Sequence, residues 1–159
     1  MAFMVIPLFV VLFFVGLTMQ GAQLVAASPG AGIPGHMETT AMVRGQVAGV
    51  FAAACLDAAY ASPGTVSNNL SVTLPDGVLP PVGSGCITTA SSSGGRNVYA
   101  YVSGASGALG QMASDGGAGA TWYRVAAAGQ ATNVITGLQS VIPQTIPAGS
   151  LLQWVQISK

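Results

Sequence analysis

The chain has 159 residues, four of them basic and four acidic, so its formal net charge is zero. Charged residues make up 5% of the sequence, far below the roughly one quarter of a typical soluble domain. This balance excludes the basic surface that nucleic-acid binding requires. It also removes the charge repulsion that keeps proteins apart, which favours contact with partner proteins and with further copies of the chain. A genome-wide bias toward Ala and Gly is the alternative explanation of this composition.

The first expected element is a transmembrane anchor at residues 1–19. Residues 2–19 are almost wholly apolar, and as a helix they would reach about 27 Å, close to the hydrocarbon thickness of a bilayer. A cleaved signal peptide is the alternative, because Val25 and Ala27 form a cleavage-like site. The length of the run and the lack of a basic residue before it favour a retained anchor. No Lys or Arg lies close to this run, so charge does not set its orientation.

Residues 20–36 predict a flexible Gly/Pro tether, which would place the domain at residues 37–159. The first element of that domain is expected to be a helix. It should begin near Glu38 or Thr39 and end before the Ser62-Pro63-Gly64 turn.

Apolar residues recur at helical spacing in this expected helix and predict the face that packs on the rest of the domain. They are Val43, Val47, Val50, Phe51, Ala54, Cys55 and Ala58. Gly45 and Gly49 lie four residues apart, a spacing that also occurs where membrane helices dimerise. Close packing against a sheet is the expected reason for them here.

The chain after Gly64 is expected to be rich in strands. Alternating, β-branched and aromatic residues predict strands at 70–74, 86–89, 97–102, 122–125, 133–136 and 151–157. A short helix is expected within 106–114, because Leu109 and Met112 are three residues apart. One helix followed by mainly antiparallel strands predicts an α+β fold, with the helix packed on the sheet.

Cys55 and Cys86 are the only cysteines, and they have neither zinc-ligand spacing nor the spacing of a C-x-x-C redox pair. In an oxidising compartment they predict one structural disulfide, which would join the end of the helix to the sheet. Two buried free thiols in a cytosolic domain are the alternative. Together with the low charge, the pair favours a periplasmic domain.

The sequence predicts no catalytic, cofactor-binding or metal-binding residue, and therefore no enzyme. His36, the sole histidine, falls in the expected tether, where neither a triad nor a metal site would have its companions. Asp57 and Asp76 are separated by a helix end and a strand, and Asp76 belongs to a Pro-Asp-Gly turn. The short glycine loops lack the Lys-Ser/Thr pair of a phosphate-binding loop.

Arg124 lies beside Trp122 and Tyr123 in the sequence, and two roles are considered for its side chain. It could serve as a handle for a ligand, or it could stack on a neighbouring aromatic ring in a purely structural role. The structural role is the expected one.

The order of these features resembles the small PilM-type proteins of type IVb (thin) pilus systems, which are encoded with pilus genes on conjugative plasmids and genomic islands. The resemblance covers most of the chain and begins with the apolar amino terminus and the helix that ends at Tyr60. The remaining matching segments are Ser62-Pro63-Gly64, Leu74-Pro75-Asp76-Gly77, Val98-Tyr99-Ala100-Tyr101-Val102 and Ile146-Pro147-Ala148-Gly149-Ser150-Leu151.

The resemblance implies a single-pass inner-membrane component of the pilus assembly apparatus, with its carboxyl-terminal domain in the periplasm. Its partners would be other pilus assembly proteins or pilins, and it brings no catalytic residues. A pilin-like minor subunit of the filament is an alternative, although no basic leader is present and no acidic residue occurs before Glu38. A secreted or periplasmic binding module is the other alternative.

Overall fold

The computed structural model describes residues 33–105, 107–114 and 119–158. The predicted anchor at residues 1–19 lies outside the described residues, as does most of the predicted tether. The chain divides into two compact units, 1–39 and 40–159. The described part of the first unit forms the first turns of a helix, and the second unit is an α+β domain, as predicted.

Helix α2 (Ile33–Ala61) begins earlier than expected, so residues 33–36 of the predicted tether are helical. A proline as the second residue of the helix is tolerated because the first backbone N–H groups have no intrahelical partner. Thr39 therefore lies inside the helix, and its hydroxyl donates to the Gly35 carbonyl at 2.8 Å. The predicted end is correct, because α2 stops immediately before the Ser62-Pro63-Gly64 turn.

The stretch Gly35–Ala61 of α2 is long and apolar enough to cross a membrane, with a mean hydropathy of 1.2. A signal sequence or the core helix of a soluble domain would pass the same test. In the second unit, α2 is a core helix, because the side chains of Phe51 and Cys55 are 4% and 0% exposed.

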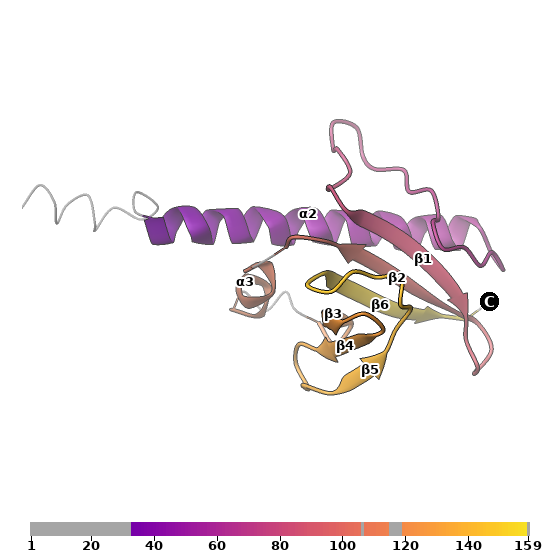
Figure 1. Ribbon diagram of the computed structural model, residues 1–159. Helices are drawn as coiled ribbons and strands as arrows, with labels where there is room; N and C mark the ends of the chain where they lie inside the picture. Colours follow the sequence, from indigo (N-terminus) through magenta and orange to yellow (C-terminus); the bar gives the residue numbers. More distant parts are fainter. Residues whose placement is uncertain (1–32, 106, 115–118, 159) are drawn as a thin grey trace, which may run out of the picture. The chain divides into compact units, whose positions relative to one another are not determined.

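Six antiparallel strands form one sheet in the order β1-β2-β6-β3-β4-β5. Their bounds are β1 (Ser84–Ala90), β2 (Arg96–Val102), β3 (Trp122–Ala127), β4 (Gln130–Asn133), β5 (Gln139–Val141) and β6 (Leu151–Ile157). Residues 40–61 of α2 lie along the face of β1, β2 and β6, and the short helix α3 (Ala108–Ser114) lies beside them (Figure 1).

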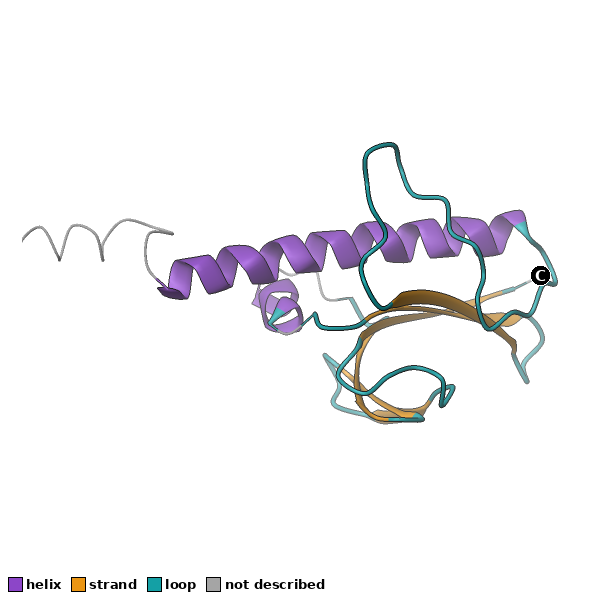
Figure 2. Ribbon diagram, turned by 45° about the horizontal axis from the view of Figure 1, so that its top comes forward, coloured by secondary structure: helices purple, strands orange, loops and turns teal. Residues whose placement is uncertain are grey.

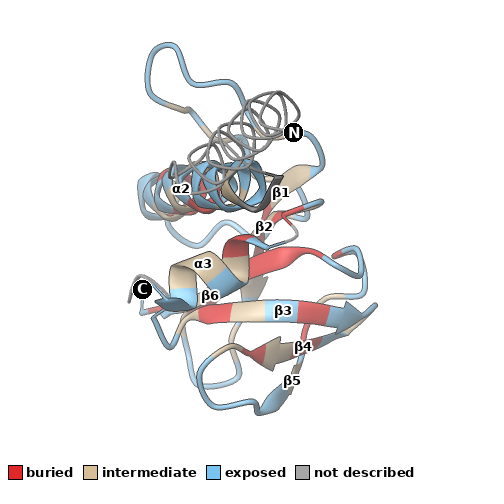
Figure 3. Ribbon diagram, turned by 90° about the vertical axis from the view of Figure 1, so that its left-hand side faces the viewer, coloured by how far each residue is buried: buried red, intermediate tan, exposed pale blue. Residues whose placement is uncertain are grey.

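One face of the sheet forms the main core with α2, and β1, β2, β3 and β6 contribute buried residues to it (Figure 3). Val98 and Ala100 of β2 point to this face, and in the register they stand opposite Val155 and Gln153 of β6. The helix contributes Ala48, Phe51, Ala52, Cys55 and Ala59. The period of two in the strands thus sets which residues meet the helix.

The opposite face is concave, because the sheet curves strongly toward β5 (Figure 2). A second apolar core fills this hollow, with Tyr99 and Leu152 from the central strands. Ile142 and Ile146, which precede β6, are 4% and 0% exposed there. The segment between β5 and β6 therefore closes the concave side of the sheet.

A disulfide joins α2 to the sheet near the carboxyl end of the helix. The Sγ atoms of Cys55 and Cys86 are 2.00 Å apart, and their Cα atoms are 5.7 Å apart. Both residues are buried in the main core. The cysteine pair expected from the sequence thus links two segments that are 31 residues apart.

Arg96 at the start of β2 is 7% exposed and caps the same end of α2. Its guanidinium donates to the carbonyl of Ala59 at 2.8 Å and to the carbonyls of Ser62 and Thr65 at 2.8 and 3.1 Å. The last turn of α2 has no basic residue of its own. A residue from the sheet therefore supplies the positive charge that the helix carboxyl terminus favours.

Two of the predicted strands are wrong. Residues 70–74 alternate as expected, and Leu70, Val72 and Leu74 pack against the main core, but the segment is extended chain rather than a strand. The chain here bonds to β1 only through a bridge between Ser67 and Thr88 and a bond from the N–H of Leu70 to the Cys86 carbonyl, not through a full ladder. Residues 133–136 are mostly a turn, and the strands here are the short β4 and β5, which the sequence did not predict.

The predicted apolar stripe of α2 is correct only in part. Phe51, Ala54 and Cys55 are buried, whereas Val43 and Val50 are 52% and 39% exposed. Apolar residues occur on several sides of this helix, so their spacing did not identify the buried side. The two glycines do not pack on the sheet. A Cβ on Gly45 would lie 3.1 Å from the Met112 side chain of α3, and one on Gly49 would meet nothing within 4 Å.

Replacing Gly85 by Ala is expected to destabilise the fold by about 1–3 kcal/mol, because it overpacks a site that an aromatic ring already fills. Gly85 stands opposite Tyr101 in the β1–β2 register, and a Cβ on it would lie 2.5 Å from the phenol oxygen. Urea unfolding of the full chain in a non-ionic detergent measures the change. In a Tyr101→Ala background the same substitution should cost much less, and an equal cost in both backgrounds would contradict this account.

Candidate functional site

A surface pocket of about 650 Å³ lies where the β3–β4 hairpin meets α3. Its lining residues come from α3, two adjacent strands, the turn after β4 and the segment before β6. They are Leu109, Arg124, Val125, Ala126, Thr132, Asn133, Val134, Gly137 and Gly149. The pocket therefore depends on segments that only the folded sheet brings together.

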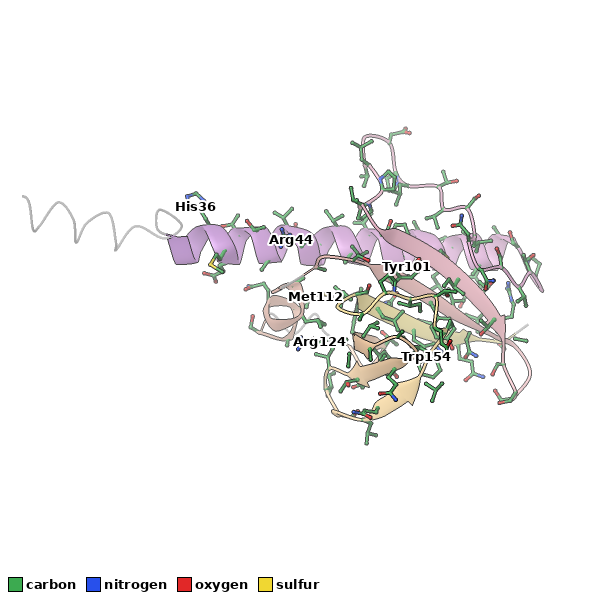
Figure 4. The ribbon with its side chains drawn as sticks, viewed as in Figure 1. His36, Arg44, Tyr101, Met112, Arg124 and Trp154 are labelled. Atoms are coloured by element: carbon green, nitrogen blue, oxygen red, sulfur yellow. A yellow bond between two sulfur atoms is a disulfide. The ribbon has the colours of Figure 1, made fainter. Side chains whose placement is uncertain are left out.

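Arg124 supplies the positive charge of this pocket (Figure 4). It is exposed, and it makes no hydrogen bond, ion pair or ring contact with another part of the chain that the structure describes. The expected stacking is wrong. Trp122 is buried in the main core, and Tyr123 lies on the other face of β3, where its ring packs 5.5 Å from that of Trp154.

Asn133 builds the rim of the pocket and is 6% exposed. Its side-chain amide donates to the Ala120 carbonyl at 2.7 Å, and its side-chain oxygen accepts from the N–H groups of Ile135 and Thr136 at 3.0 and 2.9 Å. The N–H of Gly137 donates to the Asn133 carbonyl at 3.0 Å. These bonds hold the turn at residues 133–138 in one conformation, as is typical of an Asn that begins a turn.

The same turn leads to an open edge of the sheet at β5. The hydrogen bonds from Asn133 N to the Leu138 carbonyl and from Ile142 N to the Gly129 carbonyl set the β4–β5 register. In an antiparallel pair the bonded positions alternate, so the N–H and C=O groups of Gln139 and Val141 face away from β4. Within the described part of the chain no backbone group bonds to them, so this end of the sheet offers unpaired backbone groups.

Large apolar side chains surround that open edge. Ile135, Leu138 and Val141 are 60%, 68% and 83% exposed. The opposite edge of the sheet differs, because residues 65–74 lie along β1 and bond to it at Cys86 and Thr88. Clustered exposed apolar side chains are typical of protein contact sites. We call Ile135, Leu138, Val141 and the β5 backbone the β5 edge.

The aromatic side chains on the concave face are structural. The rings of Tyr99 and Trp154 are stacked 5.5 Å apart, and the Trp154 indole N–H donates to the Asn97 side-chain oxygen at 3.2 Å. Burial raises the pKa of the Tyr99 phenol, while a side-chain hydrogen bond with Thr89 opposes that shift. The phenol is therefore neutral at physiological pH and serves the second core.

The other candidate residues do not come together. His36 and Asp57 both lie on α2, in different turns, whereas Asp76 is in the loop before β1, where the N–H of Val78 donates to the Pro75 carbonyl at 3.0 Å. No group of three His, Cys, Asp or Glu side chains forms a metal-binding cluster in the described part of the chain. The pocket and the β5 edge, rather than a cluster of titratable side chains, are therefore the candidate sites.

Sequence reasoning missed the pocket because its walls are ordinary residues. The one available signal was the Asn133-to-Gly137 segment, since Asn at the start and Gly at the end are turn residues. The short run at 133–136 instead predicts a strand.

No family model, curated protein or solved structure matches this chain. The function therefore has to be argued from the site itself.

Proposed function

We propose that this protein is a non-enzymatic, membrane-anchored component of a type IVb pilus assembly apparatus that acts through protein–protein contacts. The observation that carries the contact role is the β5 edge. It combines unpaired backbone groups with three exposed apolar side chains, Ile135, Leu138 and Val141. An extended segment of a partner can add to such an edge as a further strand.

The assignment to a pilus system rests on the sequence resemblance, and the location rests on two further features. The apolar residues 2–19 would anchor the chain in the inner membrane. The Cys55–Cys86 disulfide suits an oxidising compartment, which supports a periplasmic domain. Alkylation of the protein in intact cells tests the location, because free thiols at both positions without added reductant would contradict it.

Deleting the gene is expected to abolish pili, and the wild-type chain should restore them. The double variant Leu138→Lys/Val141→Lys should fail to restore pili, because two charges would oppose strand addition and apolar contact at the β5 edge. Both side chains are exposed, so stability should change by less than about 0.5 kcal/mol per site. Electron microscopy counts the pili, and immunoblotting verifies equal protein levels.

A photo-crosslinking residue at Val141 identifies the partner. It is expected to capture a pilus assembly protein or a pilin, identified by mass spectrometry, whereas the same residue at the exposed Thr73 should not. Intact piliation after gene deletion would contradict the proposal, as would equal capture at both positions.

A second candidate function is that of a pilin-like minor subunit within the filament. One observation favours it. In the second unit, α2 exposes Met42, Val43 and Val50, at 46%, 52% and 39%, outside the main core. Helices in a filament could pack through such a surface. Sheared and purified pili distinguish the two functions, because a subunit would be present in them and an assembly component would be absent.

A further inference from the structure

We infer that the Arg124 pocket binds the terminal carboxylate of a partner polypeptide whose last residue has an apolar side chain. The inference deepens the proposed function and rests on its claim that the protein acts by contact. The pocket shares the turn at residues 133–138 with the β5 edge, so one partner could occupy both.

The polar part of the pocket is suited to an anion. The Arg124 guanidinium has no partner among the residues that the structure describes, and no Asp or Glu is among the residues that line the pocket. Thr132 stands directly opposite Arg124 in the β3–β4 register, and both line the pocket. A guanidinium fork binds a carboxylate through two parallel hydrogen bonds, and a hydroxyl can donate a third.

The remaining walls are apolar or lack side chains. Leu109 and Val134 line the pocket and pack, partly buried, against the main core, so they form a fixed apolar surface. Gly137 and Gly149 leave the rim free of side chains. A volume of about 650 Å³ exceeds what a carboxylate alone needs, so the site also has room for an aliphatic side chain and the preceding peptide group.

A terminal carboxylate fits this pattern better than an acidic side chain. In a terminal residue, the carboxylate and the apolar side chain are both attached to the Cα atom. The carboxylate can therefore reach Arg124 while the side chain contacts Leu109 and Val134. An acidic side chain would bring its charge without an apolar group beside it. Capture of chain termini by backbone and basic groups is a recurrent mode of peptide recognition.

The test is a titration of the full isotope-labelled chain, in a non-ionic detergent, with N-acetyl-glycyl-leucine. The amide resonances of Gly137 and Gly149 should shift and saturate at millimolar concentrations. The carboxamide form of the same dipeptide should produce no saturating shift. N-acetylglutamate with its main-chain carboxyl amidated should bind at least about tenfold more weakly, because only its side chain carries a carboxylate.

Arg124→Gln is expected to weaken binding of N-acetyl-glycyl-leucine by about tenfold or more, and Arg124→Lys by less, because lysine keeps the charge but not the fork. Arg44→Gln removes the same charge from α2 and should leave binding unchanged. Unaltered resonances elsewhere establish that the variants are folded.

The inference would be overturned if the carboxamide or the glutamate derivative bound the wild-type chain as tightly as N-acetyl-glycyl-leucine does. It would also be overturned if Arg124→Gln bound N-acetyl-glycyl-leucine as tightly as the wild-type chain, or if no resonance showed a saturable shift. Such a result would leave the crosslinking at Val141 standing, so failure of the pocket and failure of the proposed function are distinguishable.

Discussion

Replacing Arg96 by Met is expected to lower the free energy of unfolding by about 3 kcal/mol. Arg96 is 7% exposed, and its guanidinium donates to the carbonyl of Ala59 in the last turn of α2 and to those of Ser62 and Thr65 just after the helix. Methionine would fill most of the volume but remove the side-chain donor of the Ala59 carbonyl and one donor each from the Ser62 and Thr65 carbonyls, which also accept from the Thr65 N–H and the Thr88 hydroxyl. It would also remove the positive charge at the helix carboxyl terminus. Urea unfolding of the full chain, followed by circular dichroism in a non-ionic detergent, measures the loss.

Two variants separate the effect of the charge from that of the hydrogen bonds. Arg124→Met removes the same charge from an exposed position on the sheet and should change stability by less than about 0.5 kcal/mol. Arg96→Lys retains the charge but cannot reach three carbonyls at once, so it should lose about half as much stability as Arg96→Met. Similar losses for Arg96→Met and Arg124→Met would show that the cap adds nothing specific.

Removing the disulfide is expected to cost about 3–4 kcal/mol. The bond closes a loop between residues separated by 31 positions, which restricts the unfolded chain. The same urea titration, applied to Cys55→Ala/Cys86→Ala, measures the change. Because both sulfur atoms belong to the main core, the smaller alanine side chains add a packing loss to this figure.

Unfolding in the presence of reductant separates the stability contributed by the disulfide bond from that contributed by packing of the two side chains. The wild-type chain should lose stability when it is unfolded in the presence of reductant, whereas the double alanine variant should not respond. A wild-type chain whose unfolding midpoint is insensitive to reductant would mean that the cysteines are not bonded in the purified protein.

Arg96 and Cys86 also show where the sequence was informative. The paired cysteines were visible in the sequence, and so was their link between helix and sheet, because a two-cysteine chain allows only one intramolecular pairing. The role of Arg96 was not visible, since its main-chain partner at Ala59 lies 37 residues earlier. A basic residue at the start of a strand carries no local signal that it caps a distant helix.

Some of the strands could likewise be predicted from the sequence, and others could not. Residues 97–102 and 151–157 were predictable, because aromatic and β-branched residues alternate in them. The strands at 130–133 and 139–141 are short and contain Gln, Ala, Ser and Asn, which have little strand preference of their own. These residues form strands because they pair with neighbouring strands. The pocket and the open edge formed by these strands could not be predicted from the sequence for the same reason. The neighbouring aromatic residues indicate stacking for Arg124, whereas the fold places this residue in a pocket.

The sequence by itself determined the low charge, the α+β class, the end of α2 before Ser62 and the one possible disulfide pairing. Each depends on composition or on interactions within a few residues, such as turn chemistry and strand alternation. The tertiary structure alone decided which side of α2 is buried, which carbonyls Arg96 caps, and that β5 rather than β1 is the open edge. These outcomes arise from packing and hydrogen bonds between segments far apart in the chain, which local sequence patterns do not encode.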